Sequence, residues 1–235
     1  MEAFNVKVKE RRKNKRAALA ERVLLPHMPV EFDDVFSQER HFIEQFVAER
    51  FDHYYQAEIT HFLPYFLSTK TGDTHTAVVG FQSAGSVKPL FLEQYLNASI
   101  EDEVSRLSGL TVERNRIAEV GNLTSIHRGT SQLLFVLIIA ILHEAGFEWT
   151  VFTATKHVQQ LLSRLNLVVI NVCEADPDKL INGKQSWGSY YDDKPNVIIG
   201  NLTNAIAQLR AHKVIGFMLE NYQDTITNIA QKITR

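Results

Sequence analysis

The spacing of hydrophobic and polar positions changes several times along the chain, and each spacing predicts a different element. Apolar residues that recur every three or four positions are typical of an amphipathic helix, and short apolar runs between polar turns are typical of strands. The polar stretch 69–73 contains Gly72 and Asp73 and predicts a hairpin turn. The elements predicted for the first half are a helix over 39–56, strands over 57–67 and 77–82, and short helices over 89–96 and 99–107.

The second half alternates strands with helices, which predicts an α/β fold with a mixed sheet in a single domain. Its longest apolar run, Leu133–Leu142, is far shorter than the roughly 20 residues needed to cross a bilayer, so a buried core helix is expected. A long polar segment, 176–195, precedes the last strand. The predicted elements are strand 114–123, helix 128–144, strand 149–154, helix 156–165, strand 167–174 and strand 196–199.

The two ends of the chain differ in character from the predicted domain over 38–200. Residues 1–37 form a basic N-terminal tail, which is either solvated or in electrostatic contact with an anionic partner or a membrane surface. Residues 201–235 predict one extra C-terminal helix with a narrow apolar stripe from Ile215 to Ile233. That stripe packs either on the domain or at a homodimer contact.

Composition excludes several classes of function. A content of 45% hydrophobic residues permits a proper core, and a net charge of -2 argues against general nucleic-acid binding. The single cysteine, Cys173, permits neither an intrachain disulfide nor a thiolate metal cluster, and the scattered histidines show no metal-ligand spacing. The basic start is not followed by an apolar segment of a signal peptide, so a cytoplasmic location is expected.

Candidate chemistry gathers in the unit 116–165. Glu119 stands in an apolar strand, where a partly desolvated carboxylate would have a raised pKa suited to a catalytic base. The alternative is an ion pair with Arg114 or Arg116. Asn122 either orients an acyl carbonyl by hydrogen bonding or satisfies a strand end or bulge.

The loop that enters the long apolar helix is rich in small residues. Gly129, Thr130 and Ser131 would let phosphate groups approach backbone N–H groups at a positive helix end, although a plain helix start uses the same residue types. The aromatic residues Trp187 and Tyr190, with Tyr191, either wall an acyl pocket or anchor their polar segment on the core.

Four separated motifs give the chain a family resemblance over residues 40–200. The motifs are PLFLEQYL (89–96), AEVGNL (118–123), GFEWTVFTAT (146–155) and WGSYY (187–191). Together they resemble the thermostable hemolysin family, which is similar to acyl-homoserine-lactone synthases within the GNAT-like acyl-CoA N-acyltransferases. The resemblance implies a mixed sheet whose fourth and fifth strands splay apart around the donor's pantetheine arm.

The resemblance also implies a reaction and a set of site residues. The donor would be acyl-CoA or the phosphopantetheine of an acyl-carrier protein, and the acceptor a small amine or an amino acid. The family's donor pattern, Arg/Gln-x-x-Gly-x-Gly/Ala, places Ile126 at its first position, so Arg128 is the candidate for the missing charge. The backbone around Leu123 is a candidate for orienting the acyl carbonyl of the donor by hydrogen bonding. Because position 126 is neither Arg nor Gln, an acyl-carrier protein stays open as an alternative donor to acyl-CoA. Acceptor-site candidates are Glu93, Glu101 and Arg116.

Two other functions remain open at this point. A membrane-active lytic protein would use the basic N-terminus for approach and the apolar C-terminal stripe for insertion. A catalytically silent domain would keep the sheet and bind an acyl ligand, and the absence of Arg or Gln at position 126 favours it.

Overall fold

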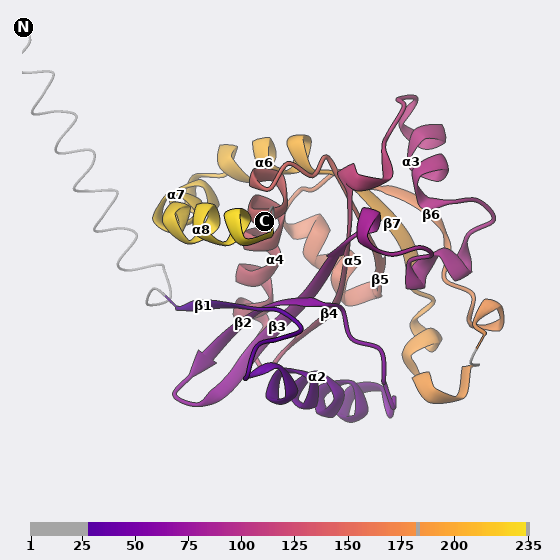
Figure 1. The fold of residues 1–235 in the computed structure, drawn as a ribbon, viewed down its shortest axis with the longest axis horizontal. Helices are drawn as coiled ribbons and strands as arrows, with labels where there is room; N and C mark the ends of the chain where they lie inside the picture. Colours follow the sequence, from indigo (N-terminus) through magenta and orange to yellow (C-terminus); the bar gives the residue numbers. More distant parts are fainter. Residues whose placement is uncertain (1–27, 182–183, 234–235) are drawn as a thin grey trace, which may run out of the picture.

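The computed structural model describes residues 28–181 and 184–233. These residues form a seven-stranded mixed sheet with helices around it (Figure 1). The strand order is β1-β2-β3-β4-β5-β7-β6, and all neighbours are antiparallel except the parallel pair β4 and β5. The strands are β1 Val30–Asp33, β2 Tyr65–Thr71, β3 Thr74–Ser83, β4 Ile117–Ser125, β5 Trp149–Ala154, β6 Ile170–Glu174 and β7 Asn196–Asn201. The predicted α/β class is confirmed.

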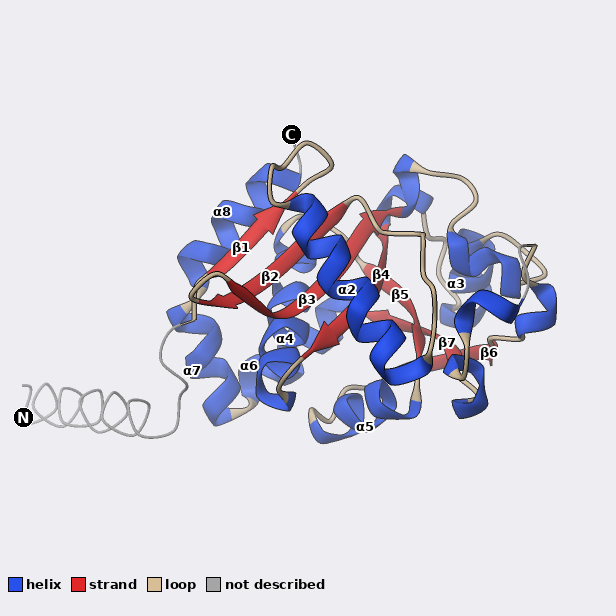
Figure 2. Ribbon diagram, turned by 90° about the horizontal axis from the view of Figure 1, so that it is seen from below, coloured by secondary structure: helices blue, strands red, loops and turns tan. Residues whose placement is uncertain are grey.

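Helices cover both faces of the sheet (Figure 2). One face carries α2, and the other carries α4 with α6 and α8 behind it. Alternation along the strands supplies both cores, because Phe66 of β2 packs on the side of α2 while its neighbour Leu67 packs on the side of α4. The helices are α2 Arg40–Tyr55, α3 Ile100–Ser108, α4 Arg128–Glu144, α5 Lys156–Arg164, α6 Leu202–Ala211, α7 Lys213–Asn221 and α8 Gln223–Ile233.

The central helix α4 is buried on all sides, as its sequence predicts. Every residue from Leu133 to Leu142 is at most 6% exposed, because the sheet covers one side of the helix and α6 and α8 cover another. An all-apolar helix of this kind is stable only in such surroundings. Among the described residues, no helix is both long enough and apolar enough to cross a membrane.

The prediction of one C-terminal helix is wrong, because α6, α7 and α8 stand in its place. The chain leaves helical geometry at His212, whose side chain caps α7 by accepting a hydrogen bond from the backbone N–H of Ile215. The predicted apolar stripe nevertheless packs on the domain. Its members Ile215, Leu219, Tyr222, Ile226 and Ile229 are buried in the core that surrounds α4.

Several other predicted elements also need correction. Val30–Asp33, inside the predicted tail 1–37, forms β1 and pairs with β2, while residues 1–27 lie outside the described part. The strand predicted over 57–67 begins only at Tyr65, since Pro64 has no backbone N–H for the sheet. Residues 89–96 form a short 3-10 helix, η2 (Phe91–Tyr95), and 114–116 form a 3-10 turn, η3 (Arg114–Arg116), before β4.

The parallel strands β4 and β5 stay together over a short distance only. They pair from Ile117 opposite Trp149 to Glu119 opposite Val151. Beyond that point β4 continues along β3, and β5 continues along β7. The sheet therefore opens into a gap directly after Glu119, which is the splay that the family resemblance implies.

Candidate active site

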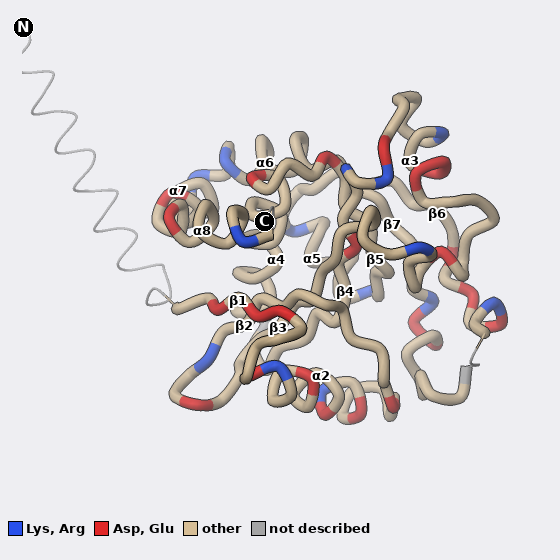
Figure 3. The backbone as a smooth tube through the Cα atoms, viewed as in Figure 1, with Lys and Arg blue, Asp and Glu red and all other residues tan. Residues whose placement is uncertain are grey.

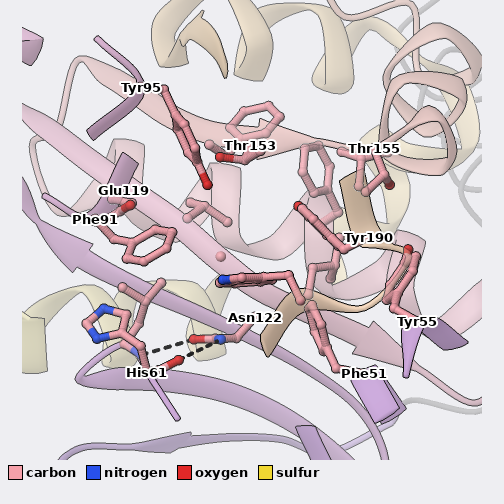
Figure 4. A pocket seen from close by; sticks show the side chains of 18 residues that line it. Phe51, Tyr55, His61, Phe91, Tyr95, Glu119, Asn122, Thr153, Thr155 and Tyr190 are labelled. Atoms are coloured by element: carbon pink, nitrogen blue, oxygen red, sulfur yellow. Dashed lines mark hydrogen bonds between the residues drawn. The ribbon is translucent and has the colours of Figure 1, made fainter. Parts of the chain in front are cut away.

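A cleft follows the gap between β4 and β5. It consists of two adjoining cavities, an inner one of about 130 Å³ and an outer one of about 700 Å³. Both are lined by Tyr55 of α2, Leu123 of β4 and Thr155 after β5, so the two cavities meet at these residues. Figure 4 shows the inner cavity, with side chains from α2, β4, β5 and the WGSYY segment turned toward it.

Glu119 lies at the inner end of this cleft. Charged residues gather on the outer helices and loops (Figure 3), whereas Glu119 is only 5% exposed. The amide of Gln82, opposite it on β3, donates a hydrogen bond of 2.6 Å to its carboxylate. Burial raises the pKa of Glu119 to about 7, although hydrogen bonds from Gln82 and the Leu92 backbone act in the opposite direction. The carboxyl group can therefore exchange a proton near neutral pH.

The ion-pair alternative for Glu119 is wrong for both arginines. Arg114 binds the carboxylates of Glu93 and Glu101 at 2.7 and 2.6 Å. Arg116 is half exposed at the start of β4, where its closest carboxylate is Glu148, 3.8 Å away. Among the described residues, Glu119 accordingly has an amide partner and no ion-pair partner.

The predicted acceptor-site residues do not line either cavity. The carboxylate of Glu93 accepts hydrogen bonds from Arg114 and from the backbone N–H groups of Leu90 and Ile100. Burial raises the pKa of Glu93, but these hydrogen bonds outweigh burial and hold it at about 2. Glu93, Glu101 and Arg114 thus form an ionic brace that joins η2, α3 and η3. We correct the prediction accordingly: neither these acids nor Arg116 is placed to contact a substrate in the cleft.

The aromatic segment is anchored on the core and also lines a cavity, and its role in an acyl pocket stays a prediction. Trp187 and Tyr190 line the inner cavity. Tyr191 lies behind them, where its hydroxyl shares a hydrogen bond of 2.5 Å with that of Tyr95. Gly188 lets the segment close over α2, because a Cβ at this position would collide with the carbonyl oxygen of Tyr55. The segment is therefore anchored on the core and forms a wall of the cavity.

The contacts of Asn122 are those of a residue that satisfies a strand irregularity, the second of the two roles predicted for it. It lies at an irregularity in the β3–β4 pairing and has a φ of 50°, a left-handed conformation that asparagine tolerates better than most residues. Its side chain accepts a hydrogen bond from the backbone N–H of Leu63 at 3.0 Å and donates one to the carbonyl of His61 at 3.5 Å (Figure 4). Asn122 therefore fixes the segment before β2 against the cleft, and its catalytic role stays a prediction.

The loop into α4 meets the outer cavity through two of its predicted residues. Gly129 and Ser131 line this cavity, and so does Leu123. Thr130 is buried, and its hydroxyl donates a hydrogen bond of 2.7 Å to the carbonyl of His127. Its side chain therefore stabilises the start of the helix, and a phosphate contact with its backbone stays a prediction. Arg128 opens the helix, and its side chain lies outside the described part.

Comparison with known proteins identifies the family. A model of the family described as thermostable hemolysin matches residues 34–206. The chain belongs to the thermostable hemolysin family. No curated protein matches it.

Solved structures place this hemolysin-family chain in the GNAT-like N-acyltransferase fold. It is similar to FeeM, an N-acyl amino acid synthase from uncultured soil microbes, with a TM-score of 0.54 and 11% identity over 77% of this chain and 95% of FeeM. It is also similar to the acyl-homoserine-lactone synthase LasI, with a TM-score of 0.53 and 10% identity over 79% and 95%. For the CoA-dependent synthase BjaI with SAM and isopentyl-CoA the TM-score is 0.50, at 10% identity over 80% and 90%.

Several cleft residues of this hemolysin-family member were missed by sequence analysis. Gln82 could have been noticed, since it is a polar and buried residue that directly follows the apolar run 77–81. Arg50 and Tyr55 carry no such signal, because they belong to the polar and mixed positions of an ordinary amphipathic helix. In the structure the guanidinium of Arg50 lies 4.6 Å over the ring of Tyr54, at the wall of the outer cavity. Tyr55 lines both cavities of the cleft.

Proposed function

We propose that this chain is a thioester-dependent N-acyltransferase that moves an acyl group to a small amine or amino acid. The observation that carries the proposal is Glu119, a buried carboxyl group whose pKa is raised to about 7, at the apex of the β4–β5 gap. Family membership and the GNAT-like fold support it.

The proposed step needs a base and an otherwise dry cleft. An ammonium group of the acceptor gives a proton to the Glu119 carboxylate, directly or through a water, and becomes a nucleophilic amine. The amine nitrogen forms a bond to the thioester carbonyl carbon, and the bond from that carbon to sulfur breaks. The attacking nitrogen loses its second proton, which the leaving thiolate takes up, so the products are an amide and a free thiol. Glu119 then returns the first proton to water.

The donor would occupy the gap and the outer cavity. Beyond Glu119 the facing edges of β4 and β5 are not paired with each other, so they offer backbone groups to the amides of a pantetheine arm. The outer cavity meets the start of α4 at Gly129 and Ser131, where the helix dipole favours phosphate groups. Arg50 and Arg164 line the same cavity and could pair with phosphate groups, although Asp192 and Asp193 line it as well. Either acyl-CoA or an acyl-carrier protein would supply such an arm.

A thiol-release assay tests the proposal. Purified protein is incubated with octanoyl-CoA and a mixture of primary amines and amino acids, free thiol is measured with a chromogenic disulfide, and acylated products are identified by mass spectrometry. Replacing the base by Glu119→Gln should lower the rate about 10²–10⁴-fold. Glu148→Gln changes an exposed acid outside the cleft and serves as the control. A Glu119→Gln variant with the wild-type rate would remove Glu119 from the mechanism.

Donor identity is tested in the same assay. Release of thiol from acyl-carrier protein but not from acyl-CoA would assign the carrier protein as donor, in line with the missing Arg or Gln at Ile126. Tight binding of acyl-CoA without release of thiol or formation of amide, under all amine conditions, would instead support a silent acyl-binding domain.

A further inference from the structure

The inner cavity is rich in aromatic rings and poor in positive charge. Its described lining includes the aromatic residues Phe51, Tyr55, Phe91, Tyr95, Trp187 and Tyr190 (Figure 4). Among the described residues that line it, none is a lysine or arginine, and Glu119 is the only acid. Any charged substrate group that enters therefore meets one carboxyl group and several π-faces.

His61 does not supply the missing cation. It lines the inner cavity with its ring stacked on Phe91 at 5.5 Å, and burial lowers its pKa below the usual 6.5. A neutral imidazole is therefore expected at pH 7 and above.

None of the described arginines lines the inner cavity. Arg114 is held in the brace with Glu93 and Glu101, and neither it nor those acids line the cavity. Arg50 and Arg164 line the outer cavity only, on the proposed donor side.

These surroundings treat an ammonium and a carboxylate in opposite ways. An ammonium gains the Glu119 carboxylate as a counterion and the rings of Phe91, Trp187 and Tyr190 as cation–π partners. A carboxylate brought to the same place has no counterion, lies close to Glu119, and would lose its hydration shell. We propose that the acceptor is a primary amine that carries an apolar or aromatic group and no carboxylate. This inference rests on the acyl transfer proposed above.

The volume of the inner cavity limits the size of the apolar or aromatic group on the acceptor. An apolar cavity of about 150 Å³ holds a benzene molecule, and the inner cavity measures about 130 Å³. A single ring or a short alkyl chain next to the amino group is the size that fits.

Isothermal titration with three matched ligands tests this inference separately from catalysis. The ligands are 2-phenylethylamine, L-phenylalanine and L-phenylalaninamide, titrated with and without saturating CoA. Phenylalaninamide has nearly the shape of phenylalanine but no carboxylate, so it separates the effect of charge from that of size. We expect both carboxylate-free amines to bind at least about 100-fold more tightly than phenylalanine, the scale of discrimination when a buried polar group is left unpaired.

The outcomes distinguish this inference from the proposed function. Equal or tighter binding of phenylalanine would overturn the inference, and so would failure of all three ligands to bind in either condition. Preferred binding of the amines without any thiol release would support the amine site while overturning acyl transfer.

His61→Arg provides the converse test. This change places a cation in the lining, so the variant should gain phenylalanine affinity about 10-fold or more and lose the preference. Phe91→Leu keeps an apolar wall but removes the ring, and should weaken both amines without improving phenylalanine. If His61→Arg folds, with an unchanged thermal midpoint, and still rejects phenylalanine, charge is not the basis of selection.

Discussion

Gln82 and Glu119 face each other across the β3–β4 pair, and the amide of Gln82 donates its hydrogen bond to a carboxylate that has no ion-pair partner among the described residues. Both side chains are buried, at 7% and 5% exposure. The hydrogen bond favours the ionised form of Glu119, whereas burial favours the protonated form, and burial prevails. The pKa of the proposed base is set by this balance.

Removal of the Gln82 amide should therefore shift the pH profile of the reaction. In Gln82→Leu the ionised carboxylate loses its donor, so the pKa of Glu119 should rise above about 7. The acid limb of the plot of kcat/KM against pH should move to higher pH, with the plateau at high pH retained. Gln45→Leu, on the exposed side of α2, is the matched control and should leave the profile in place. An unmoved acid limb in Gln82→Leu would mean that the hydrogen bond does not tune the base.

Glu119 should also make the protein less stable as pH rises. Its pKa is about 7 in the folded protein and about 4.5 when unfolded, so the folded state binds the proton more tightly. The stabilising contribution is complete below pH 4.5, is lost between pH 4.5 and 7, and amounts to about 3 kcal/mol. Glu119→Gln removes this dependence.

Chemical denaturation at pH 5 and pH 8 measures the effect. The free energy of unfolding of Glu119→Gln relative to wild type should increase between the two pH values, by up to about 3 kcal/mol. A difference that stays constant with pH would show that the folded and unfolded pKa values are alike.

Asn122 should affect stability and substrate binding more than the chemical step. Asn122→Ala leaves the backbone N–H of Leu63 without its acceptor and places alanine at a positive φ, at a combined cost of about 2 kcal/mol. The segment containing His61 and Leu63 then loosens, so KM should rise while kcat changes little. Asn122→Gly removes the same hydrogen bonds without the backbone strain and should lose less stability. A 100-fold loss of kcat in both variants at unchanged thermal midpoint would assign Asn122 to the chemistry instead.

The start of α4 offers a test of the donor site. Gly129→Glu adds a negative charge at an exposed position that lines the outer cavity. A glutamate in the first turn suits the helix, so the fold should not be weakened. The dissociation constant for octanoyl-CoA should rise about 10-fold by charge repulsion, while that for octanoyl-pantetheine, which carries no phosphate, should stay the same.

Gly129→Ala is the neutral control for this experiment. Equal effects of Gly129→Glu on both ligands would place the phosphates of the donor elsewhere.

Much of the fold could be predicted because its strongest patterns are local. The bounds of α4 and β5 agree with prediction, since each is an apolar run that ends at polar residues or at a glycine turn. The segment 57–64 was wrongly predicted to be part of a strand. Its apolar residues line the cleft and pack under α2 instead of pairing in a sheet. The C-terminal stripe predicted burial correctly but not the break at His212, which depends on a single cap.

The site was predictable only where a residue was out of place in its own element. Glu119 was conspicuous as a carboxylate in an apolar strand, and it lies in the cleft. Glu93 was equally conspicuous, yet its partner Arg114 lies 21 residues away and comes near only in the folded chain. Such pairings depend on how η2, α3 and η3 meet, which no local spacing encodes.

The name of the family records lysis, and a product of the proposed reaction would account for it. Joining an acyl chain to a small amine makes an amphiphile that can enter membranes. Purified protein freed of small molecules should not lyse erythrocytes. A lipid extract of cells that express the wild-type chain should lyse them, and an extract from cells that express Glu119→Gln should not. Lysis by the purified Glu119→Gln protein itself would show that the chain acts on membranes directly, without acyl transfer.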